Sequence, residues 1–126
     1  MGIERAQIEG LFEKVKEAND QEDYSRFLEL FADDCTFINS ALSEPVRGRV
    51  ALSRLVALWP RVVNQVEWWS IDGNRLTFGW NERQQGMRPD TPAYRGFSTF
   101  VFNDDGLVAT YEGMFDTAAV AAATAA

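Results

Sequence analysis

Near Pro60 the spacing of the apolar residues changes, and this change constrains the fold more than any other feature of the sequence. Before Pro60 the apolar residues recur at i, i+3, i+4 and i+7, which is the stripe of an amphipathic helix. The first such stripe runs through Ile8, Leu11, Phe12 and Val15. After Pro60 apolar and polar residues alternate with the period of two that is typical of half-buried strands. Helices followed by a run of strands indicate an α+β fold, with helices packed on an antiparallel or mixed sheet.

Two further helical stripes are expected before this change. They run through Tyr24, Phe27, Leu28 and Phe31, and through Leu52, Leu55, Val56 and Trp59. Because proline cannot continue a helix, Pro60 is expected to end the third helix. Between the second and third helices, residues 35–39 are expected to form a short strand that ends at Asn39.

Four strands are expected after Pro60, at residues 62–71, 75–85, 94–103 and 107–115. In the first of them simple alternation places Val66 and Trp68 on the same face. Hairpin turns are expected at Gly73 and Gly106, because glycine adopts a positive φ at little cost. The chain is expected to be one domain, 1–126, in which the Ala-rich segment 117–126 is either a frayed helix or disordered.

The amino-acid composition limits the binding partners and the catalytic groups that this chain can have. The 126 residues carry a net charge of −7, with no basic run, which argues against binding to nucleic acid or an anionic membrane. With no apolar run of about 18 residues and no apolar N-terminal segment, we expect a cytoplasmic protein. There is no histidine and a single cysteine, Cys35, so a disulfide within the chain and a thiolate or imidazole metal site are not expected. Acid–base chemistry would then use Asp, Glu, Tyr, Lys or water, without a cofactor.

Three segments resemble a known family. They are Phe31-Ala32-Asp33-Asp34-Cys35-Thr36-Phe37, the turn Pro45-Val46-Arg47-Gly48, and the closing Met114-Phe115-Asp116. With the order of elements, they make the chain similar to the nuclear transport factor 2-like superfamily, in particular its SnoaL-like branch. The resemblance implies a cone-shaped roll of three N-terminal helices on a curved sheet that encloses a cavity, often dimeric through the sheet. The same fold hosts isomerases, hydrolases, cyclases and plain binding modules.

Two enzyme types of this fold can be compared residue by residue. Ketosteroid isomerases carry a general-base Asp where this chain has Asn39, and their oxyanion-binding Tyr and Asp would fall near Val15 and Ser98. An amide cannot take a proton from carbon, so this resemblance argues against the isomerase mechanism in its usual form. Limonene epoxide hydrolases match better at Asn39 and at a Glu-Arg motif similar to Glu82-Arg83.

The epoxide hydrolase pattern also has departures in this chain. Its two catalytic carboxylates would fall on Gln85 and Gly113, so the amide and the guanidinium are kept while both acids are missing. If the resemblance sets the strand phase, Asn81, Arg83 and Gln85 face the cavity. Arg83 would then anchor a carboxylate or enolate, because its planar guanidinium binds such groups with two hydrogen bonds.

Asn39 and Gln85 would hold a water or the substrate beside Arg83, completing a catalytic set, and Asn81 would contact the ligand. In the same phase Leu76, Phe78 and Trp80 form an outer apolar face, and Phe78 and Trp80 would mediate a homodimer. The alternative is that the phase is reversed, for instance by a β-bulge, and that these three residues belong to the core.

Four more residues are candidates for ligand binding. Trp59 and Trp68 are expected as apolar walls, Tyr111 as a hydrogen-bond donor, and Gly113 as a position that widens the pocket. For Tyr111 and the tryptophans the alternative is a role in the core.

Two functions follow as hypotheses. The first is a cofactor-independent isomerase, hydrolase or cyclase that acts on a small apolar or aromatic oxygenated molecule in an aromatic-lined pocket. Its general base would be Glu82 or Glu112, and only if a bulge turns one of them inward. The second is a non-catalytic ligand-binding or dimerisation module, which needs no carboxylate.

Overall fold

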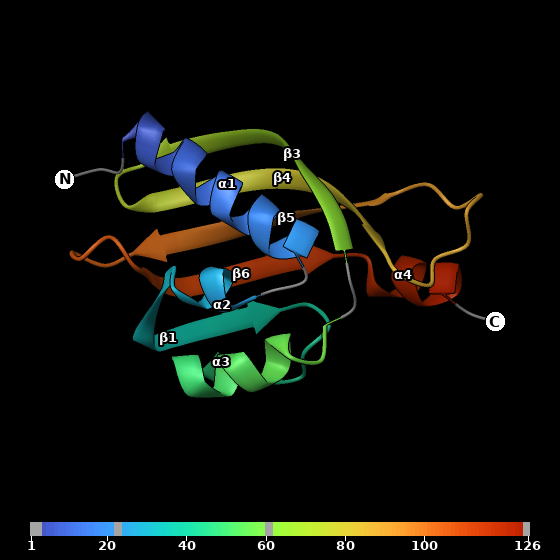
Figure 1. Cartoon of the computed structure of the whole chain (residues 1–126), viewed down its shortest axis with the longest axis horizontal. Helices are drawn as coiled ribbons and strands as arrows, with labels where there is room; N and C mark the ends of the chain where they lie inside the picture. Colours follow the sequence, from blue (N-terminus) through green and yellow to red (C-terminus); the bar gives the residue numbers. More distant parts are fainter. Residues whose placement is uncertain (1–3, 22–23, 60–61, 125–126) are drawn as a thin grey trace.

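The computed structural model describes residues 4–21, 24–59 and 62–124 of the chain (Figure 1). Within these residues, four helices accompany a six-stranded sheet. The helices are α1 (Arg5–Gln21), α2 (Ser25–Leu28), α3 (Arg49–Val56) and α4 (Thr117–Thr124). The strands are β1 (Phe31–Asn39), β2 (Val46–Arg47), β3 (Val62–Asp72), β4 (Arg75–Gln84), β5 (Tyr94–Phe102) and β6 (Val108–Phe115).

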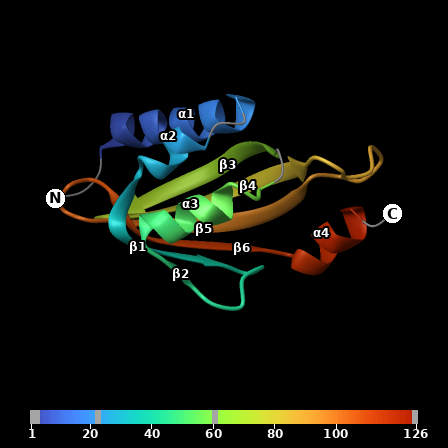
Figure 2. The same ribbon diagram turned by 60° about the horizontal axis from the view of Figure 1, so that its bottom comes forward.

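The sheet is open, with the strand order β2-β1-β6-β5-β4-β3. All neighbouring strands are antiparallel except β1 and β6, which run parallel. This parallel pair closes the meander β3 to β6 onto the first strand of the chain. Helix α1 lies across the β3–β5 side of the sheet (Figure 1), and the turned view shows α1 and α2 together on one side of it (Figure 2). The predicted α+β roll is confirmed.

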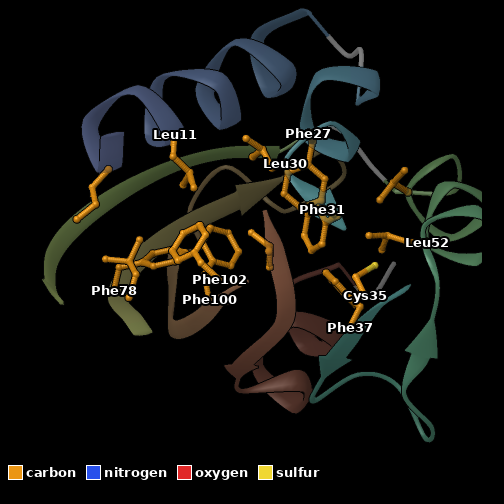
Figure 3. Close-up of a cluster of buried hydrophobic side chains, with 14 residues drawn as sticks. Leu11, Phe27, Leu30, Phe31, Cys35, Phe37, Leu52, Phe78, Phe100 and Phe102 are labelled. Atoms are coloured by element: carbon orange, nitrogen blue, oxygen red, sulfur yellow. The ribbon is translucent and has the colours of Figure 1, made fainter. Parts of the chain in front are cut away.

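The core lies between the helices and the inner face of the sheet (Figure 3). Its centre is aromatic: Phe31, Phe37 and Phe100 are fully buried, and the ring of Phe31 lies 6.3 Å and 6.2 Å from those of the other two. The predicted stripes of α1 and α3 supply Ile8 and Leu52, which are also fully buried. Burying each such side chain stabilises the fold by about 1.5–3 kcal/mol before entropy is counted.

The second helix is shorter than its apolar stripe predicts. It ends at Leu28, and Phe31, expected on the helix, is the first residue of β1. The reason is the pairing with β6: Val108 donates its backbone N–H to the Leu30 carbonyl at 2.8 Å, and Phe31 is the register partner of Val108. The third helix likewise ends early, at Val56, and Pro60 lies outside the described residues.

The described part of the Ala-rich tail, residues 117–124, is helical, and residues 125–126 lie outside the described residues. Helix α4 spans Thr117–Thr124, and Asp116 precedes it. The Asp116 carboxylate accepts the backbone N–H of Ala119 at 3.0 Å, which is the hydrogen bond of a helix N-cap. Asp116 therefore has a structural partner in the helix that follows it.

The strand phase predicted for β3 is wrong, because β3 contains a bulge. Its register with β4 shifts between Val66 and Trp68, so Glu67 is an extra residue. Val66 lines the interior, while the Trp68 side chain lies on the other face, against Gly79. Beyond the bulge Trp69 packs against the core.

In β4 the phase is the reverse of the one that the resemblance implied. Leu76 and Phe78 are buried and Trp80 packs against the core, so the alternative in which these three are core residues holds. The physical reason is that a row of large apolar side chains gains most by facing the helices. Phe78 and Trp80 cannot form a dimer interface on the outer face, because they point into the molecule.

Candidate functional site

A cavity of about 360 Å³ lies between the helices and the inner face of the sheet. Half of its lining residues are aromatic, among them Phe12 of α1, Phe37 of β1 and Phe115 of β6. Among the described residues that line it there is no lysine or arginine, and Glu82 is the one acid. The cavity is therefore largely apolar, with a single ionisable carboxyl in its wall.

Glu82 reaches the cavity because it shares the inward phase of Phe78 and Trp80 on β4. Its register partner on β5 is Tyr94, whose hydroxyl donates a hydrogen bond to the Glu82 carboxylate. Gln84 in turn donates its Nε2–H to the Tyr94 oxygen at 2.9 Å, and the Asn64 side chain of β3 also hydrogen-bonds Glu82. A carboxylate has about four lone-pair sites, so these two donors leave sites for a ligand.

Burial raises the pKa of Glu82, and the hydrogen bonds from Tyr94 and Asn64 oppose that rise only in part. Burial also raises the pKa of Tyr94, and the neighbouring Glu82 charge raises it further. Tyr94 is thus a stable proton donor to the carboxylate. A carboxylate whose pKa is raised is a stronger base than one in water.

A second polar group lies on the same wall, at Ser98 of β5. Trp80 donates its indole Nε1–H to the Ser98 hydroxyl at 2.9 Å, and the Ser98 hydroxyl lies 2.9 Å from the hydroxyl of Tyr111 on β6. Burial raises the pKa of Tyr111 to about 12; the Ser98 hydrogen bond acts against this and the charge of Glu82 adds to it. Glu82 and Tyr111 both line the same cavity.

Two glycines let these rings lie flat on the sheet. A Cβ at Gly96 would come within 2.5 Å of Cζ2 of Trp80, and a Cβ at Gly113 within 2.5 Å of the Tyr111 hydroxyl. Gly113 is also the register partner of Ser98. The Trp80 ring thus occupies the space above Gly96 and the Tyr111 ring the space above Gly113, and from these positions both rings reach the Ser98 hydroxyl. Gly113 was expected to widen the pocket, but the Tyr111 side chain fills the space above it.

Asn39 and Trp59 line the cavity, as expected from the sequence, together with Tyr111. The Asn39 side-chain oxygen accepts the backbone N–H of Ala41 at 2.7 Å, so its Nδ2 is the part able to donate to a ligand. Trp59 packs edge-on against Tyr24 and tilted against Phe37 at ring distances of 5.7 Å and 5.9 Å. It forms part of the apolar wall.

The other expected site residues lie elsewhere. Arg83 is on the outer face of β4, and its guanidinium donates to the backbone carbonyls of Thr91 and, at 3.0 Å, of Arg88 in the loop that follows. Asn81 shares the outward phase of Arg83, and Gln85 is exposed. The expected amide–guanidinium cluster is therefore not formed in the cavity.

Trp68 is also outside the cavity, on the outer face, where 52% of it is exposed. The bulge in β3 is the cause, because it turns Trp68 away from the face that Val66 occupies. Glu112, the other base considered from the sequence, is exposed and does not line the cavity.

Four polar side chains of the wall were not expected there from the sequence: Asn64, Gln84, Tyr94 and Ser98. Glu82 was expected to face inward only with the help of a bulge, whereas the plain alternation of β4 is enough. A usable signal was present for Glu82 and Gln84. They continue the alternation that begins at Leu76 and Phe78, so the apolar pattern alone places their side chains inward.

Two absences hold for the described ranges 4–21, 24–59 and 62–124. No group of three or more Cys, Asp and Glu residues there could hold a metal ion. No helix there is both long and apolar enough to cross a bilayer.

Comparison with known proteins gives a family and several structural neighbours. The SnoaL-like domain family matches residues 12–111. The search of curated proteins gave no significant match.

Three solved structures are similar to the chain in fold. An LEH-like epoxide hydrolase from M. tuberculosis has 16% identity and a TM-score of 0.67, with 86% of this chain and 81% of that chain covered. A protein proposed to be a ketosteroid isomerase, from Kribbella flavida, has 18% identity and a TM-score of 0.68, with 85% and 76% covered. A nuclear transport factor 2-like protein of unknown function from Burkholderia pseudomallei has 17% identity and a TM-score of 0.77, with 93% and 96% covered. At these identities the likeness establishes the fold alone.

Proposed function

The chain belongs to the SnoaL-like domain family, and from that premise we propose that it is a cofactor-independent enzyme that transfers a proton on a small, apolar, oxygenated molecule. Glu82 is the base, and the substrate lies in the aromatic-lined cavity between the helices and the sheet. The proposed reaction class is isomerisation through an enolate.

The observation that carries this proposal is the Glu82 carboxyl in the wall of a largely apolar cavity. Burying an ionisable group costs free energy that a leucine at the same position would not. A pocket that only binds apolar molecules gains nothing from that cost. A base gains from it, because desolvation brings the pKa of a carboxyl closer to working pH.

The atoms and electrons of the reaction balance without a further reactant. In a substrate whose α-carbon lies between the carbonyl and a C=C bond, an ionised Glu82 oxygen takes a proton from that α-carbon, and the C–H electron pair forms the C=C bond of a conjugated enolate while the carbonyl π pair moves onto oxygen. Glu82 is then neutral. Return of the proton to another carbon of the conjugated enolate restores the carbonyl and the ionised carboxylate, and releases an isomer. Tyr94 and Asn64 hold the carboxylate in place throughout.

Asn39, Trp59 and Tyr111 are proposed to contact the ligand. Asn39 has an Nδ2 group that can donate, and Trp59 offers an apolar surface. The names of two structural neighbours, an epoxide hydrolase and a protein proposed to be an isomerase, are compatible with proton transfer in this fold.

We also propose that the protein is a homodimer through the outer face of the sheet, with other residues than those expected from the sequence. Val63, Trp68 and Phe97 are 63%, 52% and 51% exposed on that face. Sedimentation velocity of the wild type and of Trp68→Glu tests this, because a charge at the centre of an apolar interface would shift the dimer to monomer.

The enzymatic proposal is tested by exchange of α-hydrogens for deuterium in D₂O. Proton NMR follows a panel of cyclic and aryl methyl ketones with the wild type, with Glu82→Gln and with the matched control Glu112→Gln. Loss of a positioned base is expected to slow exchange by about 10²–10⁴-fold in Glu82→Gln. Glu112→Gln, an exposed position, should keep the wild-type rate. If ketones bind the wild type but their α-hydrogens do not exchange, the enzymatic proposal is rejected and the protein is a non-catalytic ligand-binding module.

A further inference from the structure

The three side chains that meet at Ser98 form a hydrogen-bond chain whose direction can be worked out. Its first link is fixed, because an indole N–H can only donate: Trp80 donates to the Ser98 oxygen. Ser98 is completely buried, and among the described residues Tyr111 is the other polar partner of its hydroxyl.

The second link has two possible directions. If Tyr111 donated to Ser98, the single proton of the Ser98 hydroxyl would be buried without an acceptor, which is costly. If Ser98 donates to Tyr111, its proton is satisfied, and the Tyr111 proton is left for whatever lies in the cavity. The second direction is favoured because Tyr111 is only partly buried and can donate its proton to a ligand or water in the cavity, whereas Ser98, although it lies on the cavity wall, has no exposed surface.

The chain therefore runs from Trp80 through Ser98 to Tyr111 and ends on a hydroxyl that donates into the cavity. Each donor polarises the next, so the Tyr111 O–H is a stronger donor than it would be at the same site without Ser98 behind it. The position of Tyr111 is also fixed, since its ring stacks on Phe37 at 4.4 Å with an interplanar angle of 11°. A fixed donor in a largely apolar site is suited to an oxygen that gains negative charge.

The charged residues that line the cavity limit the chemical class of the ligand further. With Glu82 in the wall and no lysine or arginine among its described lining residues, a carboxylate or phosphate would meet a like charge and find no counter-ion. An uncharged molecule meets neither problem.

We infer that the substrate is an uncharged, mainly apolar carbonyl compound whose oxygen accepts a hydrogen bond from Tyr111, with Ser98 and Trp80 as positioning residues behind it. The inference rests on the proposed function for the reaction itself, but the binding mode is independent of any turnover. It gives Tyr111 the role of an oxygen anchor on the wall that also carries the base.

The experiment uses aryl ketones without α-hydrogens, phenyl tert-butyl ketone and benzophenone, labelled with ¹³C at the carbonyl. These probes cannot exchange a proton, so the result does not depend on Glu82 acting as a base. Infrared difference spectra give the carbonyl stretch of the bound probe, and titration gives its affinity.

In the wild type the bound carbonyl stretch is expected at lower frequency than in hexane. Tyr111→Phe should remove this shift and weaken binding by roughly 2- to 10-fold, the value of one neutral hydrogen bond. The matched control is Tyr24→Phe, which removes another hydroxyl from the cavity wall and should leave the shift unchanged. Ser98→Ala should reduce the shift in part. Should that variant fail to fold, Ser98→Cys serves, because a thiol of similar size is a weaker donor.

An unshifted carbonyl in the wild type, or an equal shift in wild type and Tyr111→Phe, would overturn the inference, as would failure of both ketones to bind. So would benzoate binding as tightly as the ketones at pH 8, because the charge argument requires an anion to bind at least about 10-fold more weakly. If the wild type shows the carbonyl shift but catalyses no α-hydrogen exchange, the proposed reaction is rejected and the binding mode stands. If Tyr111→Phe exchanges α-hydrogens at the wild-type rate, the role of Tyr111 as the oxygen anchor is rejected and the proposed reaction stands.

Discussion

Glu82 and Tyr94 face each other across neighbouring strands, and the Tyr94 hydroxyl donates a hydrogen bond to the Glu82 carboxylate. This contact compensates only part of the cost of burial, since the pKa of Glu82 remains raised. A raised pKa means that the folded protein binds a proton at this site more tightly than the unfolded chain does. Stability must then depend on pH in a direction opposite to that of a salt-bridged acid.

Glu82 is expected to destabilise the protein at neutral pH and to lose that effect in acid. As pH falls through the raised pKa of folded Glu82 toward the unfolded value near 4.5, the wild type gains stability relative to Glu82→Gln, by about 1.4 kcal/mol for each unit of pKa shift. Urea denaturation of both proteins between pH 4 and 8 measures this difference. Other carboxylates titrate in both proteins and cancel, so a difference independent of pH would show that Glu82 is not desolvated.

Replacement of Gly113 by alanine is expected to displace Tyr111. The added Cβ would lie 2.5 Å from the Tyr111 hydroxyl, so the ring must leave Ser98. Overpacking of this kind costs about 1–3 kcal/mol of unfolding free energy, and the variant should also lose the infrared shift of a bound ketone. The control is Gly10→Ala in α1, where nothing lies within 4 Å of the new Cβ. That substitution should stabilise the helix by about 0.5–1 kcal/mol. Equal stability of the two variants would contradict the packing described for Gly113.

Arg83→Ala is expected to loosen the β4–β5 loop without weakening ligand binding. The guanidinium holds the backbone carbonyls of Thr91 and Arg88, so its loss should raise hydrogen exchange of amides in residues 86–93. Ketone affinity should change less than about 2-fold, because Arg83 does not line the cavity. Arg95→Ala is the matched control, since its partner is Glu67 on β3. A large loss of ketone affinity in Arg83→Ala, but not in Arg95→Ala, would contradict this prediction and support Arg83 as the ligand anchor expected from the sequence.

Most of the fold could be predicted from apolar spacing and turn residues. The strands after Pro60 lie within a few residues of their expected positions, and Gly73 and Gly106 have the positive φ values, 62° and 77°, that the turns require. The second helix could not be placed correctly, because the position of Phe31 depends on its pairing with Val108, a residue far along the chain. Local periodicity contains no information on that contact.

The candidate site was predicted less well, and the reason is strand phase. The row Leu76, Phe78 and Trp80 indicates by itself that Glu82 points inward, but a motif similar to that of epoxide hydrolases suggested the opposite face. A shift of one residue moves every side chain of a strand to the other face, so this one decision exchanged Glu82 for Arg83. The meeting of Trp80 and Tyr111 at Ser98 was beyond prediction, because it depends on the registers of three strands.

The bulge at Glu67 also bears on how this scaffold can change over evolutionary time. Because it adds one residue in the middle of β3, the half of the strand that lines the cavity and the half that carries Trp69, over which Arg5 of α1 lies, follow separate alternations. Deletion of Glu67 would bring both halves into one alternation and force one of them to present its outer side chains to the interior. Substitutions at Val62 and Val66, by contrast, can diversify the pocket while Trp69 keeps its place. An irregularity of one residue thus separates the part of the strand that is free to vary with the ligand from the part that must stay constant.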